Sequence, residues 1–174
     1  MSDPLISVII PTYGREEALR DSIVDVLKQD YPNYEVLVVD QTPKHQPEIE
    51  AYLKEQADSG KIQWYRLDWA SLPGARNYAV RRSAGEIILF IDDDVLLEPG
   101  YLAAHAKNYQ NPEIGAVAGR VFDRMKMEDS AKGYTQGEGN YTELEYLPPQ
   151  AMDPGVAWYY IDLVHTTKPQ QVLT

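Results

Sequence analysis

The sequence predicts an α/β fold in which a doubly wound, mostly parallel sheet carries helices on both faces. Short apolar runs of strand length alternate with segments whose apolar residues recur at helical spacing, a pattern typical of β–α–β units. The most apolar run, residues 87–91, lies between Gly85 and three consecutive acids. Such a run indicates a strand that is buried on both faces, and we expect it to lie centrally in the sheet.

The first β–α–β unit is expected within the first 40 residues. Residues 5–10 form an apolar run that should end as a strand at Pro11, because proline cannot donate to the sheet. Residues 16–29 place apolar side chains at helical spacing. A second strand is expected at 34–39 and ends in Asp40. Two parallel strands joined by a helix form a right-handed crossover.

The same alternation continues along the chain up to residue 122. The further expected elements are a helix at 48–58, an edge strand at 61–67, a helix at 72–83, the central strand, a helix at 100–109, a strand at 114–122 and a late strand at 156–164. Between the last two strands the periodicity disappears. We therefore expect one domain over residues 1–174, with an irregular part over 123–174.

Composition restricts the class of protein. The chain has 174 residues and a net charge of −11, from 27 acidic and 16 basic residues, which argues against a nucleic-acid-binding surface. It has no cysteine, so disulfides and thiolate zinc sites are excluded. No apolar run reaches the ~18 residues of a membrane span. These features predict a cytoplasmic chain without a membrane segment.

The three acids after the central strand are the first candidate site. Ligands of open α/β sheets bind at the carboxyl ends of the strands, where Asp92, Asp93 and Asp94 are expected. Three adjacent carboxylates repel one another unless a cation or hydrogen-bond donors hold them. Asp92 and Asp94 could share a hard divalent ion that keeps positions open for phosphate oxygens. The alternative is a solvated acidic turn that caps the next helix.

Other polar residues should converge on the same edge of the sheet. Tyr13 follows the first strand, Asp40 ends the second, and Arg76 lies near the start of a helix. Tyr13 could stack on a base, Asp40 could accept a hydrogen bond from a base or ribose, and Arg76 could contact a base carbonyl or a diphosphate. Together with a metal-binding pair, this set suits a nucleoside diphosphate.

These motifs, in this order and spacing, resemble the family 2 glycosyltransferases, which have the GT-A fold, a Rossmann-like doubly wound sheet. The resemblance covers residues 5–122, and its motifs are Val8 to Arg15, Asp30 to Pro32 leading to Val36 to Asp40, Gly74 to Asn77, and the D-x-D element within Phe90 to Val95. It implies that a sugar is transferred from a nucleoside-diphosphate sugar to an acceptor hydroxyl, with inversion at the anomeric carbon.

The resemblance also implies the site residues. A Mg²⁺ or Mn²⁺ ion would be held mainly by Asp94, with Asp92 near the ribose or the metal. The donor would be a UDP- or GDP-sugar, and the acceptor a saccharide, lipid or protein. The implied contacts to the nucleotide sugar are Pro11, Thr12, Tyr13, Arg15, Asp40, Arg76, Asp92 and Asp93.

Two departures from the family pattern bear on function. Many relatives carry a second acid where this chain has Gln41. The general base and the acceptor loop of the family usually lie beyond the point where this chain ends. We therefore expect 5–122 to be the nucleotide-sugar-binding half of a truncated domain that binds donor but transfers sugar poorly. Asp153 and Asp162 are the only late aspartates that could act as base.

Three other classes of protein are alternatives to this interpretation. A nicotinamide dehydrogenase needs a Gly-x-Gly-x-x-Gly turn after the first strand, which residues 11–15 do not form. A sugar nucleotidyltransferase would carry a glycine-rich loop with an arginine at that place, and this is also missing. A non-catalytic module that binds nucleotide sugars remains the alternative from a different functional class.

Overall fold

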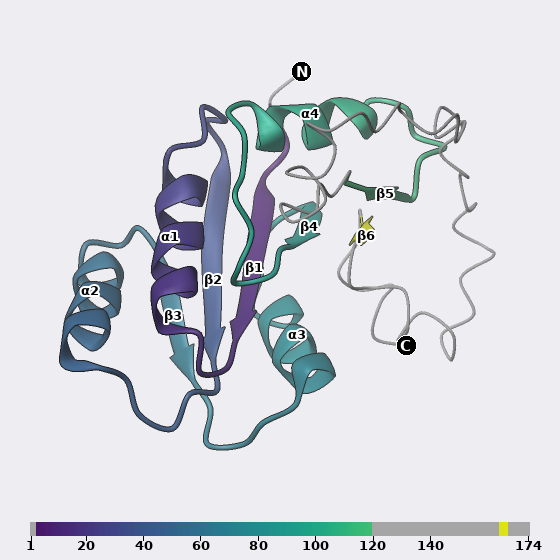
Figure 1. The fold of residues 1–174 in the computed structure, drawn as a ribbon. Helices are drawn as coiled ribbons and strands as arrows, with labels where there is room; N and C mark the ends of the chain where they lie inside the picture. Colours follow the sequence, from purple (N-terminus) through teal and green to yellow (C-terminus); the bar gives the residue numbers. More distant parts are fainter. Residues whose placement is uncertain (1–2, 120–163, 167–174) are drawn as a thin grey trace, which may run out of the picture.

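In the part of the chain that the structure describes, six strands form one sheet with helices on both faces. The computed structural model describes residues 3–119 and 164–166 (Figure 1). Within them the elements are β1 Ile6–Thr12, α1 Glu16–Leu27, β2 Tyr34–Asp40, α2 Pro47–Asp58, β3 Gln63–Arg66, α3 Leu72–Val80, β4 Ile87–Phe90, α4 Tyr101–Asn108, β5 Ala116–Ala118 and β6 Val164–Thr166. The strand order is β3-β2-β1-β4-β6-β5.

The sheet is parallel over its first four strands. β1 lies between β2 and β4 and is parallel to both, with Thr12 opposite Asp40 and Ile9 opposite Phe90. β3 pairs in parallel with β2 at the sheet edge, as predicted. β6 pairs antiparallel with β4, and β5 antiparallel with β6. The predicted class, a doubly wound and mostly parallel α/β sheet, is confirmed.

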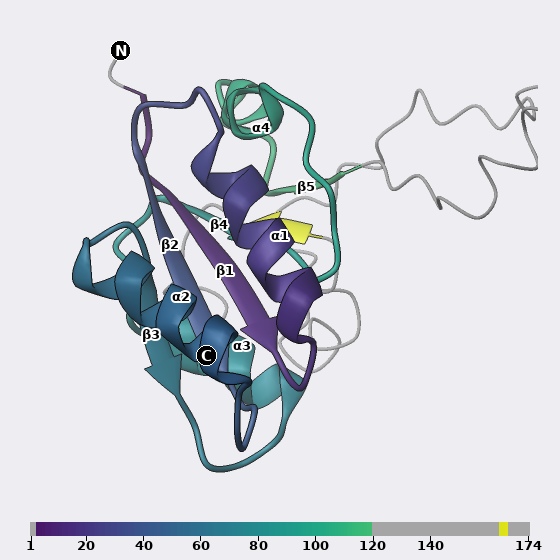
Figure 2. The same ribbon diagram turned by 60° about the vertical axis from the view of Figure 1, so that its left-hand side comes forward.

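The core has two layers because side chains alternate across the strands. Ile6, Val8 and Ile10 of β1 pack with residues of α1, α2 and α4 on one face. Ile9, between them, packs on the opposite face with α3. Figure 2 shows α1 and α2 in front of the strands and α3 behind them. Each fully buried isoleucine contributes about 1.5–3 kcal/mol to the free energy of folding. Because a slip of one residue would move these side chains to the other face, their burial fixes the register of the strand.

The prediction that the first strand ends at Pro11 is wrong, since β1 continues to Thr12. Backbone groups point alternately to the two neighbouring strands: the Ile9 carbonyl accepts from Ile91 on the β4 side, and the Thr12 carbonyl accepts from Gln41 on the β2 side. Pro11 therefore turns its nitrogen to the β4 side, where β4 has already ended. The missing N–H removes no bond from the ladder.

The other predicted elements agree with the structure to within a few residues. The helix expected at 16–29 ends at Leu27, and the one expected at 72–83 ends at Val80. The strand expected at 114–122 is β5, over Ala116–Ala118, and its last three predicted positions lie outside the described residues. Of the late strand expected at 156–164, the structure describes only residue 164, where β6 begins.

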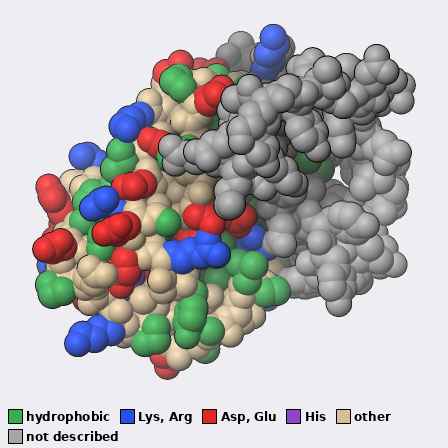
Figure 3. Space-filling view, viewed as in Figure 1, with side chains coloured by type: hydrophobic (Ala, Val, Ile, Leu, Met, Phe, Trp, Pro, Cys, Tyr) green, Lys and Arg blue, Asp and Glu red, His purple; other side chains and the backbone are tan. Residues whose placement is uncertain are grey.

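A search of the described helices for a membrane-crossing segment finds none with the necessary length and apolar character. On the face shown in Figure 3, basic side chains are interspersed with acidic ones rather than gathered into a stripe. An anionic ligand would therefore be held on this face by a few positioned cations and not by a broad basic surface.

Gly85 is a point at which the sheet tolerates no side chain. A Cβ atom at this position would lie 2.5 Å from Ser7 Oγ and 2.6 Å from Ser7 N. The Ser7 hydroxyl cannot move freely, because it accepts from the Gly85 N–H and donates to Glu35. The backbone of β1 and the segment that enters β4 thus require glycine for their close approach.

We predict that Gly85→Ala lowers the free energy of unfolding by about 1–3 kcal/mol, because the added methyl group overpacks this contact. Urea unfolding followed by circular dichroism measures the change. Ala84→Ser is the control, since it adds one heavy atom at the exposed neighbouring position and should change stability by less than about 0.5 kcal/mol. Equal stability of Gly85→Ala and the control would contradict the prediction.

Candidate active site

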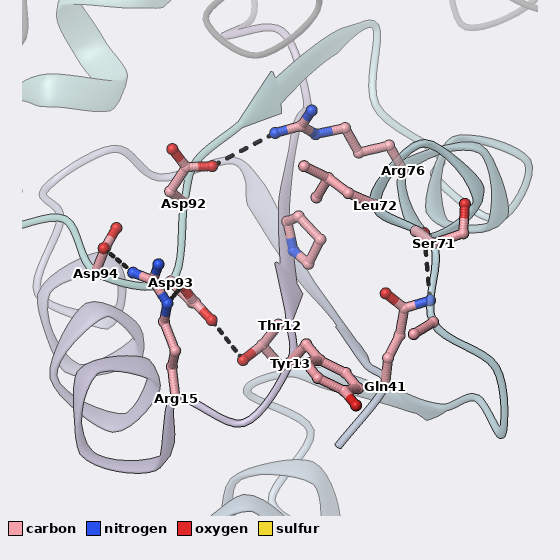
Figure 4. A pocket seen from close by; sticks show the side chains of 12 residues that line it. Thr12, Tyr13, Arg15, Gln41, Ser71, Leu72, Arg76, Asp92, Asp93 and Asp94 are labelled. Carbon is pink, nitrogen blue, oxygen red and sulfur yellow. Dashed lines mark hydrogen bonds and ion pairs between the residues drawn. The ribbon is translucent and has the colours of Figure 1, made fainter. Parts of the chain in front are cut away.

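A pocket of about 580 Å³ lies at the carboxyl ends of β1 and β4 and beside the start of α3 (Figure 4). This volume suits a small organic ligand. Its lining residues come from five chain segments: Pro11, Thr12, Tyr13, Arg15, Gln41, Ala70, Ser71, Leu72, Arg76, Asp92, Asp93 and Asp94. Every residue predicted from sequence as a nucleotide-sugar or metal contact lines this pocket, with Asp40 as the single exception.

The three acids take two different roles. The Asp93 carboxylate is turned inward and accepts a hydrogen bond from Thr12 Oγ1 at 2.6 Å. Burial raises the pKa of Asp93, although the Thr12 hydrogen bond and the Arg15 charge oppose this. The side chains of Asp92 and Asp94 are 50% and 48% exposed and line the pocket. The acidic turn thus holds one carboxylate internally and presents two.

Two arginines balance the exposed carboxylates. Arg76, buried on α3, places Nη2 3.4 Å from Asp92 Oδ1 and its guanidinium 5.8 Å from the centre of the Phe90 ring. Burial lowers the pKa of Arg76, and Asp92 counteracts this, so the guanidinium remains charged. Arg15 forms an ion pair with Asp94. Figure 4 shows Arg76 extending from α3 toward Asp92, and Arg15 beside Asp94.

The chemistry of Asp92 and Asp94 fits a hard divalent cation. Carboxylate oxygens are the ligands that Mg²⁺ and Mn²⁺ prefer, and Mg²⁺ commonly takes one or two of them together with phosphate oxygens and water. The described residues contain no group of three or more acidic, histidine or cysteine side chains arranged as a ready metal site. The protein would therefore supply a partial ligand set, and a bound phosphate group would supply more.

The opposite wall contains residues that the sequence motifs did not identify. Gln41 Nε2 donates to the carbonyls of Trp69 at 2.8 Å and Ser71 at 3.3 Å. Since both partners are acceptors, the amide nitrogen must face them, and Oε1 faces the pocket (Figure 4). Ser71 also caps α3 by accepting from Gly74 N. Leu72 and Tyr13, 45% and 56% exposed, complete an apolar edge.

The expectation that Asp40 faces the nucleoside requires correction. Its side chain is fully buried and does not line the pocket. Its carboxylate accepts three hydrogen bonds, from His45 Nε2 at 2.5 Å, Trp64 Nε1 at 2.9 Å and Thr42 N at 2.9 Å. These donors occupy the carboxylate, so Asp40 organises the loop beneath the pocket and the next residue, Gln41, reaches the ligand side.

The alternation of side chains along β2 is the sequence signal that would have placed Asp40 and Gln41 on different faces of the sheet. Val36 and Val38 pack toward α1 and α2, whereas Leu37 and Val39 pack toward α3. Continuing this alternation places Asp40 on the α1–α2 face and Gln41 on the α3 face, where Ser71 and Leu72 lie. The two base candidates, Asp153 and Asp162, lie outside the described residues.

Comparisons with known proteins match most of this chain to one family model and to several glycosyltransferases. The family described as glycosyl transferase family 2 matches residues 7–160. The O-antigen biosynthesis protein RfbC of Myxococcus xanthus is 32% identical over 124 residues, which are 68% of this chain and 9% of that protein. The Escherichia coli protein described as UDP-Glc:alpha-D-GlcNAc-diphosphoundecaprenol beta-1,3-glucosyltransferase WfgD is 37% identical over 54% of this chain and 36% of its own length.

Solved structures with the same fold include two nucleotide-sugar complexes. The mannosyltransferase PcManGT from Pyrobaculum calidifontis, in complex with GDP-Man and Mn²⁺, matches with a TM-score of 0.63 and 27% identity over 70% of this chain and 37% of its own. TarS 1-349 of S. aureus, in complex with UDP-GlcNAc, matches with a TM-score of 0.57 and 25% identity over 68% of this chain and 37% of its own. This chain thus spans well under half the length of these relatives.

We predict that Asp40→Ala lowers the free energy of unfolding by about 3–5 kcal/mol, because it leaves His45 buried without one of its two carboxylate partners. Chemical unfolding at pH 6 measures the loss. Asp68→Ala removes the same charge from an exposed position and should change stability by less than about 0.5 kcal/mol. A stable Asp40→Ala protein with selectively weakened nucleotide binding would restore the nucleoside-contact role.

Proposed function

The chain belongs to glycosyl transferase family 2, and we propose that it serves inverting transfer of a sugar from a nucleoside-diphosphate sugar to an acceptor hydroxyl. The observation that carries the proposal is the pocket at the ends of β1 and β4. It combines two half-exposed carboxylates, two arginines, an exposed tyrosine and an amide oxygen within one cavity. This set matches the successive groups of a nucleoside diphosphate: a flat base, a polar base edge and a charged diphosphate.

Nucleotide recognition is assigned to the wall formed by Tyr13, Gln41 and Leu72. Tyr13 offers an aromatic face for stacking. Gln41 Oε1 offers an acceptor for a ring N–H, which uracil and guanine carry and cytosine lacks. Structural neighbours solved with UDP-GlcNAc and with GDP-Man support a UDP- or GDP-sugar as donor. Pro11 and Thr12 form the floor between this wall and the acids.

The diphosphate is assigned to the acidic turn and its arginines. Asp94, together with Asp92, would hold Mg²⁺ or Mn²⁺, which when bound offsets the negative charge of the departing nucleoside diphosphate. Arg76 is held close to Asp92 by α3 and can donate to a phosphate or sugar oxygen. Arg15 is more than half exposed and can turn from Asp94 toward an incoming anion. Asp93 keeps the turn in place through Thr12.

In the proposed reaction the acceptor hydroxyl attacks the anomeric carbon from the side opposite the diphosphate. A C–O bond forms there, the bond to the diphosphate oxygen breaks, and a base takes the hydroxyl proton. Such a base typically contributes ~10²–10⁴-fold in rate. None of the residues lining the pocket is assigned this role; Asp153 and Asp162 remain candidates. The acceptor is a saccharide, a lipid or a protein, and the proposal does not choose among them.

The assay that tests this function follows release of UDP or GDP from donor sugars, with and without candidate acceptors. Acceptor-dependent release supports transfer, and slow release without acceptor is hydrolysis of the donor by water. We expect this chain to bind the donor but to transfer the sugar slowly, because the assigned contacts all serve the donor. Tight donor binding with no release under any condition would favour a non-catalytic nucleotide-sugar-binding module.

We predict that Mn²⁺ strengthens nucleotide binding by at least about tenfold and that Asp94→Asn removes this enhancement, because the carboxylate is a proposed metal ligand. Calorimetric titration of UDP and GDP with and without Mn²⁺ measures both effects. Glu98→Gln is the matched control, as it removes one exposed carboxylate four residues farther along. Equal nucleotide affinity with and without metal in the wild type would refute metal binding at this turn.

We predict that Gln41→Ala weakens binding of UDP or GDP by about 2–10-fold, the scale of one neutral hydrogen bond. The wild type should also bind UDP more tightly than CDP, because the Gln41 acceptor meets a lone pair instead of an N–H on cytosine. Calorimetry with the three nucleotides provides the comparison. Gln46→Ala changes the same residue type on the same loop, outside the pocket, and should leave affinity unchanged. Equal UDP and CDP affinities would contradict this assignment.

A further inference from the structure

A buried histidine lies between two carboxylates beneath the pocket. His45 Nε2 is 2.5 Å from Asp40 Oδ2, and His45 Nδ1 is 3.0 Å from Glu16 Oε2. The side chains of His45 and Asp40 are 1% and 0% exposed, and that of Glu16 is 16% exposed. None of the three residues lines the pocket. The network therefore acts on the ligand only through the segments that it joins.

The geometry requires a protonated ring. A neutral imidazole donates from one nitrogen only, so its other nitrogen would direct a lone pair at a carboxylate oxygen. The imidazolium donates from both nitrogens and satisfies both acids. Burial lowers the pKa of His45, but the hydrogen bonds and charges of Asp40 and Glu16 outweigh it, so the pKa lies above its ordinary value. The Trp64 indole, facing from β3, donates to Asp40 and adds no charge.

The histidine joins the two loops that supply the pocket wall. Glu16 is the first residue of α1 and directly follows the loop that carries Tyr13 and Arg15. Asp40 ends β2 and directly precedes Gln41. Further contacts tie the same loops: Thr42 Oγ1 accepts from Gly14 N at 2.9 Å, and Thr42 N donates to Asp40. The imidazolium is the buried cation at the centre of this junction.

We propose that protonated His45 is a positioning residue of the donor pocket, which keeps the loop of Tyr13 and Arg15 in register with the loop of Gln41. Loss of the ring proton replaces one hydrogen bond by a repulsion, and it leaves the buried carboxylate of Asp40 and the partly buried carboxylate of Glu16 without a counter-charge. The loops then sample other arrangements, and apparent nucleotide affinity falls in proportion to the fraction that stays competent. This inference rests on the proposed donor-binding function.

The direction of the pH effect follows from the sign of the shift. A group whose folded pKa is raised contributes stability that is fully present below its unfolded pKa, about 6.5 for histidine. That contribution is lost as the pH rises through the folded pKa. Nucleotide binding should therefore be strongest near pH 6 and weaken on the alkaline side. His105 is buried, which lowers its pKa to about 4, so it stays neutral over this range.

The test is calorimetry of UDP and GDP with Mg²⁺ from pH 6 to pH 9 on the wild type and three variants. The wild type should lose about tenfold in affinity across this range. His45→Gln, which cannot carry the charge, should bind weakly and should lose no affinity as the pH rises beyond the change that titration of the nucleotide itself causes. Lys44→Gln removes a positive charge from the exposed neighbouring position and should keep the wild-type profile. Titration of the nucleotide itself is common to all four proteins.

Glu16→Gln separates positioning from simple structural damage. The new amide can donate to a neutral His45 nitrogen, while the other nitrogen donates to Asp40, so the junction no longer needs the second proton. At pH 9 this variant should therefore bind the nucleotides more tightly than the wild type does at the same pH. Nitrogen NMR shifts of the His45 ring should show two attached protons in the wild type at pH 6 and one in Glu16→Gln at pH 9.

The outcomes distinguish this inference from the function on which it rests. Wild-type binding that does not change with pH, or a His45→Gln protein with the wild-type profile, overturns the role of His45 and leaves donor binding intact. A singly protonated His45 ring at pH 6 overturns it as well. If the wild type binds neither nucleotide at any pH, the proposed function fails, and the positioning role fails with it.

Discussion

The hydrogen bond between Thr12 and Asp93 is the interaction on which the arrangement of the pocket depends. The pairing of β1 with β4 ends at Ile9 and Phe90. The segments that follow the two strands could therefore separate at the point where the residues that line the pocket begin. The buried bond from Thr12 Oγ1 to Asp93 holds them together three residues later. By turning Asp93 inward, it leaves the residues on either side directed to the pocket, where they meet the two arginines.

This arrangement explains how a chain with a net charge of −11 can present a site for an anionic ligand. Two arginines lie beside the acids, one on α3 and one at the start of α1, and in the proposed function the two exposed carboxylates would hold a divalent cation. The cations that could contact an anion are thus provided by the position of two arginines and not by the overall composition.

Much of the fold and most of the pocket could be predicted from the sequence because parallel strands order their carboxyl ends by topology. Apolar runs and helical spacing located β1 to β4, and the acids and Arg76 followed from their places at strand and helix ends. Pro11 and Asp40 could not be placed correctly in this way. The direction of a backbone nitrogen or a side chain at a strand end depends on where the neighbouring strand stops and on which donors are near.

The exposure of an ion pair, more than its residue types, sets what it does in this molecule. Arg15 and Asp94 are about half exposed, and such pairs contribute little net stability, so a metal or a phosphate can exchange with either partner at small cost. His45 and Asp40 are fully buried, and separating them would strand a charge in the interior. The pair of Arg15 and Asp94 therefore suits a role in which its side chains rearrange when a ligand binds. The pair of His45 and Asp40, together with Glu16 on the other nitrogen of His45, suits a role in which it keeps two loops in place while the ligand binds and leaves.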